Sequence, residues 1–81
     1  MNTLAIEMHP QAHNVTCTEV SLIVDLLDGR TISAPLIWFP LLSKASAEQL
    51  SNWVLLGDGE GIHWPEIDED LSVAGLLTGT H

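Results

Sequence analysis

The sequence predicts a small α+β domain, in which an antiparallel sheet built from β-hairpins carries two short helices. Three observations lead to this class. Alternating apolar residues flank an Asp-Gly pair, a helix-capping pattern occurs in mid-chain, and a second pair of strand-like segments follows it. With 81 residues, the chain is expected to form one domain with one core over residues 1–81.

Residues 1–14 are predicted to be weakly structured or to hold a short strand. Apolar residues alternate from Leu4 to Met8, and the His9-Pro10 pair then interrupts the pattern.

The Asp28-Gly29 pair is typical of a hairpin turn between two strands. A two-residue loop would mix apolar and polar positions on each face of the sheet. A three-residue loop instead pairs Val24 with Ile32 and keeps one face apolar, with Gly29 supplying the positive φ of a bulged turn. We favour this register. Its apolar face comprises Val20, Leu22, Val24, Leu26, Ile32, Ala34 and Leu36.

The second half of the chain predicts a helix and a second strand pair. Residues 46–49, Ser-Ala-Glu-Gln, have the form of a capping box, so a helix should run from about Ser46 to Asn52. Residues 53–56 and 62–64 look like two strands around a glycine-rich loop. The segment from Leu36 to Leu42 is too apolar to be a free linker.

An acidic run, Asp68 to Asp70, precedes the apolar residues near the end of the chain. Because the helix macrodipole favours carboxylates at a helix start, we expect a final helix that ends at Gly79.

The charge of the chain excludes several classes of function. Eleven acidic residues against two basic ones give a formal net charge of -9, which disfavours binding to nucleic acid or to an anionic membrane. A single cysteine, Cys17, excludes an internal disulfide framework and a multi-cysteine zinc site. No apolar run is long enough for a membrane span, so we expect a cytoplasmic protein.

Several motifs resemble those of the bacterial family DUF2442, a domain of unknown function. The resemblance covers about residues 15–79 and is most specific from Gly61 to Leu77. The motifs are Asp28-Gly29-Arg30, Ser33-Ala34-Pro35-Leu36, Trp38-Phe39-Pro40, Trp53, Gly61-Ile62-His63-Trp64-Pro65 and Asp68-Glu69-Asp70-Leu71-Ser72-Val73.

The resemblance implies a small α+β protein without established catalytic residues. It also implies a second small protein as partner, because members often look like halves of presumed toxin–antitoxin gene pairs. Some relatives add a helix-turn-helix domain, but this sequence stops at His81, so we expect no direct contact with nucleic acid. The chain departs from the family at Ile37, Leu41, Val54 and Ala74, which are apolar where relatives commonly look charged or where a carboxylate would be unsurprising.

The leading functional hypothesis is an antitoxin-like interaction module that binds a basic partner protein and forms a homodimer through exposed sheet edges. The competing interpretation of the acidic segment is a solvated surface that caps a helix. The predicted partner-binding residues are Asp58, Glu60, Glu66, Asp68, Glu69, Asp70, Ile37 and Leu41.

Two alternatives stay open: a domain that binds a small ligand or metal ion with His63, Trp64 and the 58–70 carboxylates, and an acidic mimic of nucleic acid. The possible ligand pocket comprises Trp38, Trp53, His63 and Trp64, although tryptophans in so small a chain are more often core.

We expect no metal site, no cofactor and no enzymatic activity. His9, His13 and Cys17 follow a helical metal-ligand spacing, but Pro10 interrupts it. Cys17 has no nearby cation by sequence, and no Gly-x-Ser-x-Gly motif occurs.

Overall fold

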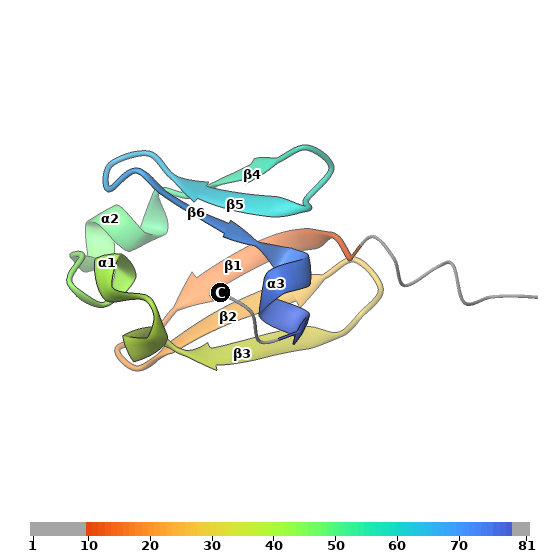
Figure 1. Cartoon of the computed structure of the whole chain (residues 1–81), viewed down its shortest axis with the longest axis horizontal. Coiled ribbons are helices and arrows are strands. Elements are labelled where there is room, and N and C mark those ends of the chain that lie inside the picture. The colour runs from red at the N-terminus through yellow and green to blue at the C-terminus, as the bar shows by residue number, and fades with distance from the viewer. Residues whose placement is uncertain (1–9, 79–81) are drawn as a thin grey trace, which may run out of the picture.

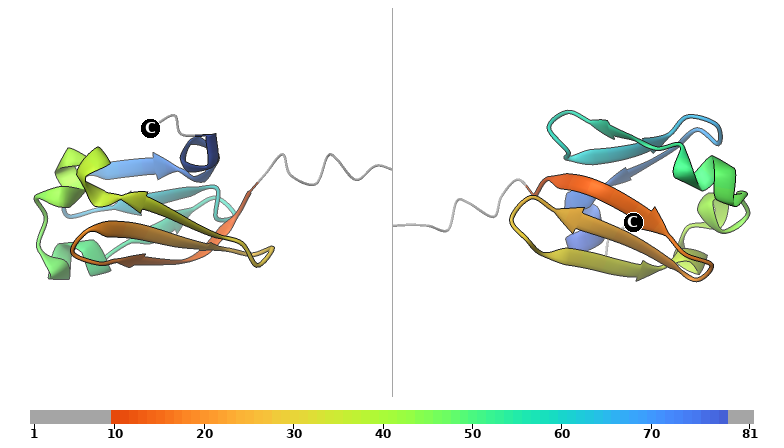
Figure 2. Two further views of the ribbon diagram at one scale, coloured as in Figure 1. Left: turned by 90° about the horizontal axis from the view of Figure 1, so that it is seen from below. Right: turned by 180° about the vertical axis from the view of Figure 1, so that it is seen from behind.

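The computed structural model describes residues 10–78 and confirms the α+β class. It contains two three-stranded antiparallel sheets with short helices (Figures 1 and 2), where one sheet and two helices were expected. The strand predicted from Leu4 to Met8, and His9, lie outside the described residues. The first sheet has the order β1-β2-β3, with β1 (Ala12–Cys17), β2 (Ser21–Leu26) and β3 (Thr31–Pro35). The second has the order β4-β5-β6, with β4 (Val54–Leu56), β5 (Gly61–Trp64) and β6 (Glu69–Ser72).

Four short helical segments complete the fold within residues 10–78. They are the 3₁₀ helix η2 (Leu36–Trp38) and the α-helices α1 (Pro40–Ser43), α2 (Ala47–Ser51) and α3 (Val73–Thr78). Helices α1 and α2 lie together at one end of the molecule, whereas α3 lies toward the other end (Figures 1 and 2). None of these helices is long and apolar enough to cross a membrane.

The hairpin between β2 and β3 has the predicted register. Val24 lies opposite Ile32, and Leu22 lies opposite Ala34. The Leu26 amide donates to the Arg30 carbonyl at 2.8 Å and closes a three-residue loop. Gly29 in that loop has a φ of +98°, which only glycine adopts without strain.

Strand β1 was not predicted from the sequence, and a β-bulge explains why its pattern escaped detection. The register shifts between Ala12 and Asn14, so His13 is the extra residue. The bulge turns both Ala12 and Val15 into the core, although they are three positions apart. The alternation of buried and exposed side chains is therefore interrupted by one residue in the sequence, although the strand still presents one face to the core.

The predicted capping box at the start of α2 is confirmed. The Ser46 hydroxyl accepts a hydrogen bond from the Gln49 amide at 3.1 Å, and the Gln49 side chain accepts one from the Ser46 amide at 3.0 Å. The predicted strand pair that follows the helix is present as β4 and β5.

The prediction that Asp68 to Asp70 begin a helix is wrong. These residues complete the β5–β6 turn and start β6, where Leu71 lies opposite Ile62 and Asp70 opposite His63. Helix α3 begins only at Val73, and the Ser72 hydroxyl, not a carboxylate, accepts from the Gly75 amide at 3.1 Å. Pairing with β5 therefore overrides the local preference for a helix start.

A single core joins the two sheets. The fully buried Trp64 donates its indole N–H to the Leu50 carbonyl at 3.1 Å, which ties β5 to α2. The Ala12 amide donates to the Gly59 carbonyl at 2.7 Å, and the Val73 amide to the Glu60 carbonyl at 3.0 Å, so the β4–β5 turn is fastened to β1 and α3. The buried core residues are Ala12, Val15, Leu22, Val24, Leu26, Ala34, Leu36, Phe39, Leu42, Leu50, Ile62, Trp64, Val73 and Leu76.

Candidate interaction surface

The segment that follows β3 buries one residue in three and exposes the apolar residues between them. Leu36, Phe39 and Leu42 are in the core, as expected for tight helical turns with about three residues per turn. The remaining positions carry apolar side chains that stay exposed to solvent. Ile37 is 78% exposed, Trp38 50% and Leu41 49%.

Val20 adds to this exposed apolar surface, against the prediction that it faces inward on the first strand of the hairpin. The Thr18 hydroxyl accepts from the Val20 amide at 3.2 Å and the Ser21 amide at 2.9 Å, which makes a turn and delays β2 until Ser21. Val20 is consequently 72% exposed. We call Val20, Ile37, Trp38 and Leu41 the apolar corner.

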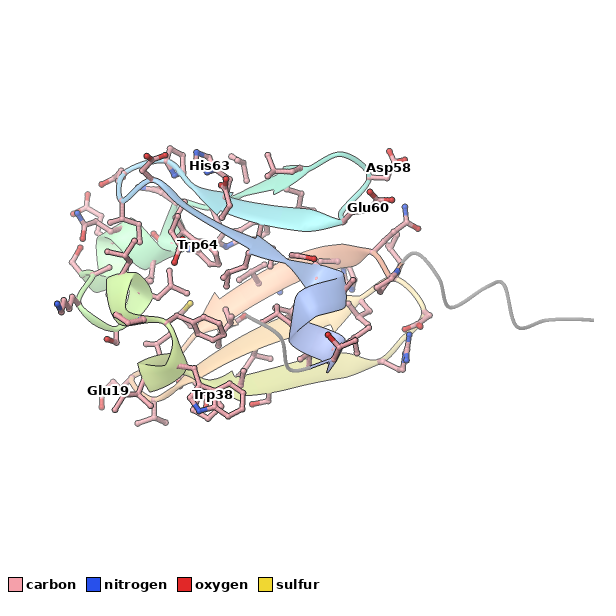
Figure 3. The ribbon with its side chains drawn as sticks, viewed as in Figure 1. Glu19, Trp38, Asp58, Glu60, His63 and Trp64 are labelled. Carbon is pink, nitrogen blue, oxygen red and sulfur yellow. The ribbon has the colours of Figure 1, made fainter. Side chains whose placement is uncertain are left out.

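Backbone hydrogen bonding holds the parts of the apolar corner together. The Leu36 amide donates to the Val20 carbonyl at 2.8 Å, so the β1–β2 turn adjoins η2. Figure 3 shows Glu19, from the same turn, at the corner where Trp38 lies. A carboxylate and the exposed tryptophan therefore lie at the same corner of the molecule. Sequence reasoning missed Glu19 and Val20, and the Thr18 turn is the signal that marks them as surface residues.

The β5–β6 turn and α2 lie at the same end of the molecule (Figures 1 and 2), and both carry further carboxylates. The Ile67 amide donates to the Trp64 carbonyl at 3.3 Å, and Asp68 adopts a positive φ of 53°. The Asn52 side chain donates to the Glu66 carboxylate and thereby fastens the turn to the end of α2. We call the exposed or half-buried carboxylates of this end the acidic rim, which comprises Glu19, Glu48, Glu66, Asp68 and Glu69.

The six carboxylates predicted as partner-binding do not lie together. Asp58 and Glu60 lie in the β4–β5 turn, and Glu66 and Asp68 in the β5–β6 turn, at opposite ends of β5. The four residues of β5 separate the two turns by about 13 Å. Figure 3 shows Asp58 and Glu60 at the end of the molecule away from Glu19 and Trp38.

The four residues of the possible ligand pocket are also dispersed. His63 and Trp64 are consecutive in β5, so their side chains lie on opposite faces of the sheet. Trp64 lies in the core, whereas His63 lies on the outer face and contacts the Asp70 carboxylate across the strands. Trp53 is half-buried, and Trp38 lies at the apolar corner, far from His63 in Figure 3.

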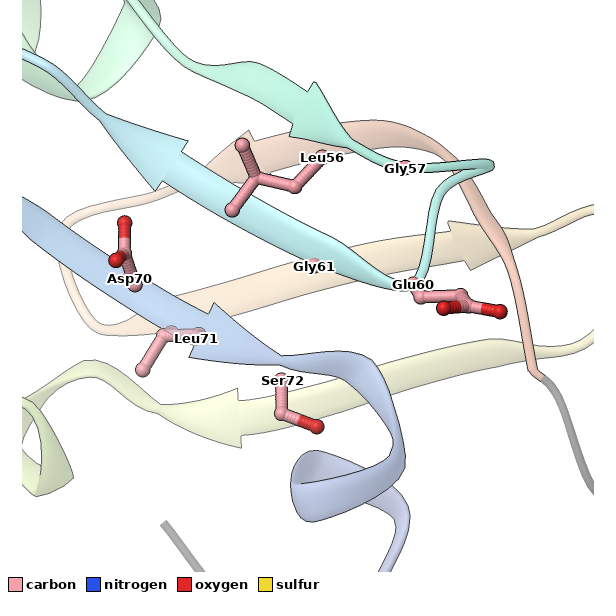
Figure 4. Close-up of a pocket in the computed structure, with 7 residues that line it drawn as sticks. All are labelled: Leu56, Gly57, Glu60, Gly61, Asp70, Leu71 and Ser72. Atoms are coloured by element: carbon pink, nitrogen blue, oxygen red, sulfur yellow. The ribbon is translucent and has the colours of Figure 1, made fainter.

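An open hollow of about 550 Å³ lies on the outer face of the second sheet (Figure 4). Gly61, which has no side chain, lies at the centre of the hollow. Around it lie Leu56, Glu60, Asp70 and Ser72. Residues 10–78 hold no group of three His, Cys, Asp or Glu side chains that could bind a metal ion.

Two smaller cavities, of about 370 and 210 Å³, adjoin Cys17 between β1 and α2. Burial raises the pKa of the Cys17 thiol, which disfavours the nucleophilic thiolate.

The two basic residues lie at different places. Arg30, in the β2–β3 turn, forms an ion pair with Asp28 at 2.7 Å. Its side-chain hydrogen bond to Asp28 lowers the pKa of that carboxyl. Lys44 follows α1 and lies at the end that carries the acidic rim. This end therefore has five carboxylates against one lysine, and its local charge is negative.

Comparison with known proteins places the chain in a family. The model of the family described as "Protein of unknown function (DUF2442)" matches residues 12–81. The chain belongs to the DUF2442 family. The chain is similar in structure to a protein of unknown function from Rhodospirillum rubrum, which was solved by crystallography. The two chains are 38% identical and superpose with a TM-score of 0.74, and the match covers 86% of this chain and 87% of that one.

A second solved structure shares the fold alone. It is the solution NMR structure of an uncharacterized protein from Chromobacterium violaceum, 24% identical, with a TM-score of 0.74 over 86% of this chain and 66% of that one. No curated protein matches the sequence significantly. Both similar structures come from bacteria and share the fold of this chain.

Proposed function

We propose that the chain is a non-catalytic, antitoxin-like interaction module of the cytoplasm that binds one small, basic partner protein. The observation that carries the proposal is the placement of the apolar corner and the acidic rim at the same end of the molecule. Exposed apolar side chains supply the area that a partner buries, and the carboxylates select a partner of opposite charge.

The apolar corner supplies the larger part of the binding energy in this proposal. Ile37 and Trp38 are held by short helical turns whose inward residues are fixed in the core, so they lose little conformational freedom on binding. An exposed tryptophan at the end that carries the carboxylates suits an interface with a basic protein, because tryptophan and arginine are enriched in interface hot spots.

The acidic rim acts mainly on the rate of association. A net charge of -9 attracts a basic protein from a distance, and the rim directs it to the end that carries the apolar corner. Such attraction falls as salt rises, with a screening length of about 10 Å at 0.1 M salt.

The test is affinity capture from a bacterial lysate with wild-type and variant chains as baits, followed by quantitative mass spectrometry. Ile37→Ser with Trp38→Ser removes two of the four apolar side chains of the apolar corner. Leu27→Ser, in the β2–β3 turn at the other end, is the matched control because Leu27 is likewise exposed and apolar. We expect one basic protein to be retained by wild type and by the control, and to fall at least about tenfold with the corner variant, given the usual cost of losing a hot spot.

Equal capture by the corner variant and the control would refute the proposed surface. Capture of no stoichiometric partner at low salt would refute the proposed function.

A further inference from the structure

Each sheet has two outer strands, and three of the four have features that discourage pairing with another chain. Strand β1 carries the bulge at His13 and lies against α2. Strand β3 ends in Pro35, which has no backbone N–H, and α3 packs near it. Strand β6 carries Glu69 and Asp70. Bulges, prolines, charges and covering helices are the devices by which natural sheets protect their edges.

Strand β4 is short, with three residues, but within residues 10–78 it has no bulge, proline, charged side chain or packed helix. Within residues 10–78 it lies at the end of its sheet, with β5 on one side and no strand on the other. Its residues are all apolar, and no charged residue occurs from Ser51 to Gly57. Val54 and Leu56 point outward and are 46% and 41% exposed, whereas Leu55 is half-buried. A strand that is apolar on both faces is typical of the interior of a sheet.

The backbone of β4 can pair on its open side. The Leu56 carbonyl accepts from the Gly59 amide at 3.1 Å and the Glu60 amide at 3.2 Å, so it is directed toward β5. Since carbonyls alternate along a strand, the Leu55 carbonyl is directed to the open side.

We propose that this edge is the interface of a homodimer, in which β4 of two copies pairs antiparallel about a two-fold axis at Leu55. This register places Val54 of one copy opposite Leu56 of the other, and Trp53 opposite Gly57. Gly57 has no side chain and leaves room for the indole. The sequence of the strand thus complements itself, which is what a closed two-fold interface requires.

Charge also favours a second copy over the basic partner at this edge. No residue of the strand itself, Val54 to Leu56, is charged, so two copies that pair through β4 place no like charges directly opposite each other. Each copy as a whole has a formal net charge of -9, so the two copies repel each other. Because salt shortens the screening length from about 10 Å at 0.1 M to about 3 Å at 1 M, dimerisation should strengthen with salt.

The interface is small, so we expect a weak dimer with a dissociation constant on the order of 10–100 µM. The test is sedimentation equilibrium of the purified chain from low to high micromolar concentration at 0.1 M and 1 M salt. Val54→Lys places a charge on the edge and should raise the dissociation constant at least about tenfold. Val20→Lys is the matched control, because it makes the same substitution and the same change of net charge on an exposed valine away from β4.

The expected result is a dimer in wild type and Val20→Lys that strengthens with salt, and a monomer in Val54→Lys with an unchanged circular dichroism spectrum. Should Val54→Lys fail to fold, Val54→Thr keeps the β-branched shape and is expected to weaken the dimer as well. A monomer at all concentrations, equal weakening by the control, or species that grow beyond the dimer would each overturn the proposal. This inference does not depend on the proposed function, since partner binding weakens with salt and involves the apolar corner.

Discussion

Replacement of Gly59 by alanine should destabilise the protein far more than the same replacement of Gly29. The two glycines have nearly equal φ angles, +93° and +98°, so both alanine variants carry the same backbone strain of about 1–2 kcal/mol. A Cβ at Gly29 meets no atom within 4 Å. A Cβ at Gly59 would lie 2.4 Å from the Ala12 carbonyl oxygen and 3.0 Å from the Ala12 nitrogen, both of them backbone atoms.

The magnitude follows from what the clash displaces. Moving β1 away from Gly59 breaks the 2.7 Å hydrogen bond from the Ala12 amide and leaves a buried donor without its partner, which costs about 1–3 kcal/mol more. The side-chain bond from Gln11 to the Asp58 carbonyl, 2.9 Å long, is strained by the same shift. We therefore expect a loss of about 2–5 kcal/mol for Gly59→Ala and about 1–2 kcal/mol for Gly29→Ala.

Urea unfolding followed by tryptophan fluorescence measures both values, because the buried Trp64 reports the integrity of the core. The total stability of a chain of this size is about 4–12 kcal/mol, so Gly59→Ala should remove a large part of it. If the two variants unfold at the same urea concentration, the fastening of the β4–β5 turn to β1 does not hold the sheets together as described.

Two further predictions concern α2 and the thiol beside it. Ser46→Ala removes the capping box and should lower the free energy of unfolding by about 1 kcal/mol in the same urea assay, whereas Ser33→Ala on the exposed face of β3 should change it little; equal effects would contradict the capping role. Cys17 should react with iodoacetamide at pH 8 more slowly in the folded chain than in urea, because burial raises its pKa. Since the folded-state pKa is the higher one, this thiol's contribution to stability is full below the unfolded value of 9.0 and is lost as pH rises through the folded pKa; equal alkylation rates in the two states would contradict the burial.

Local chemistry in the sequence predicted the elements that depend on it. The Gly29 turn, the hairpin register and the Ser46 capping box involve residues within a few positions of one another, and the structure has all three. Strand β1 escaped because its bulge breaks the alternation that identifies strands. Strand β6 was mistaken for a helix start because only its pairing with β5, which is not local, decides its conformation.

The candidate surface was predictable in part. Ile37 and Leu41 were expected as contact residues, and both are exposed at the apolar corner. Asp58 and Glu60 were grouped with Glu66 because they are near in sequence, but the reversal of the chain at each end of β5 places them apart. Proximity in sequence is therefore a poor guide to a shared face wherever short strands alternate with turns.

Removing carboxylates from the acidic rim tests whether these charges steer a partner or only keep the surface solvated. Glu66→Gln with Asp68→Asn removes two carboxylates of the rim, and asparagine tolerates the positive φ of Asp68. Asp58→Asn with Glu60→Gln removes one aspartate and one glutamate at the opposite end and is the matched control. The two variants have the same net charge, so any difference between them is due to position.

The most direct test of the proposed function is the association rate of the captured partner with these two variants, measured by stopped flow at low and high salt. We predict that the rim variant associates about three- to tenfold more slowly than wild type at low salt, with a flatter salt dependence, and that the control stays within about twofold. Equal rates for the two variants, in chains that keep the wild-type circular dichroism spectrum, would contradict the claim that the rim steers a basic partner to the apolar corner.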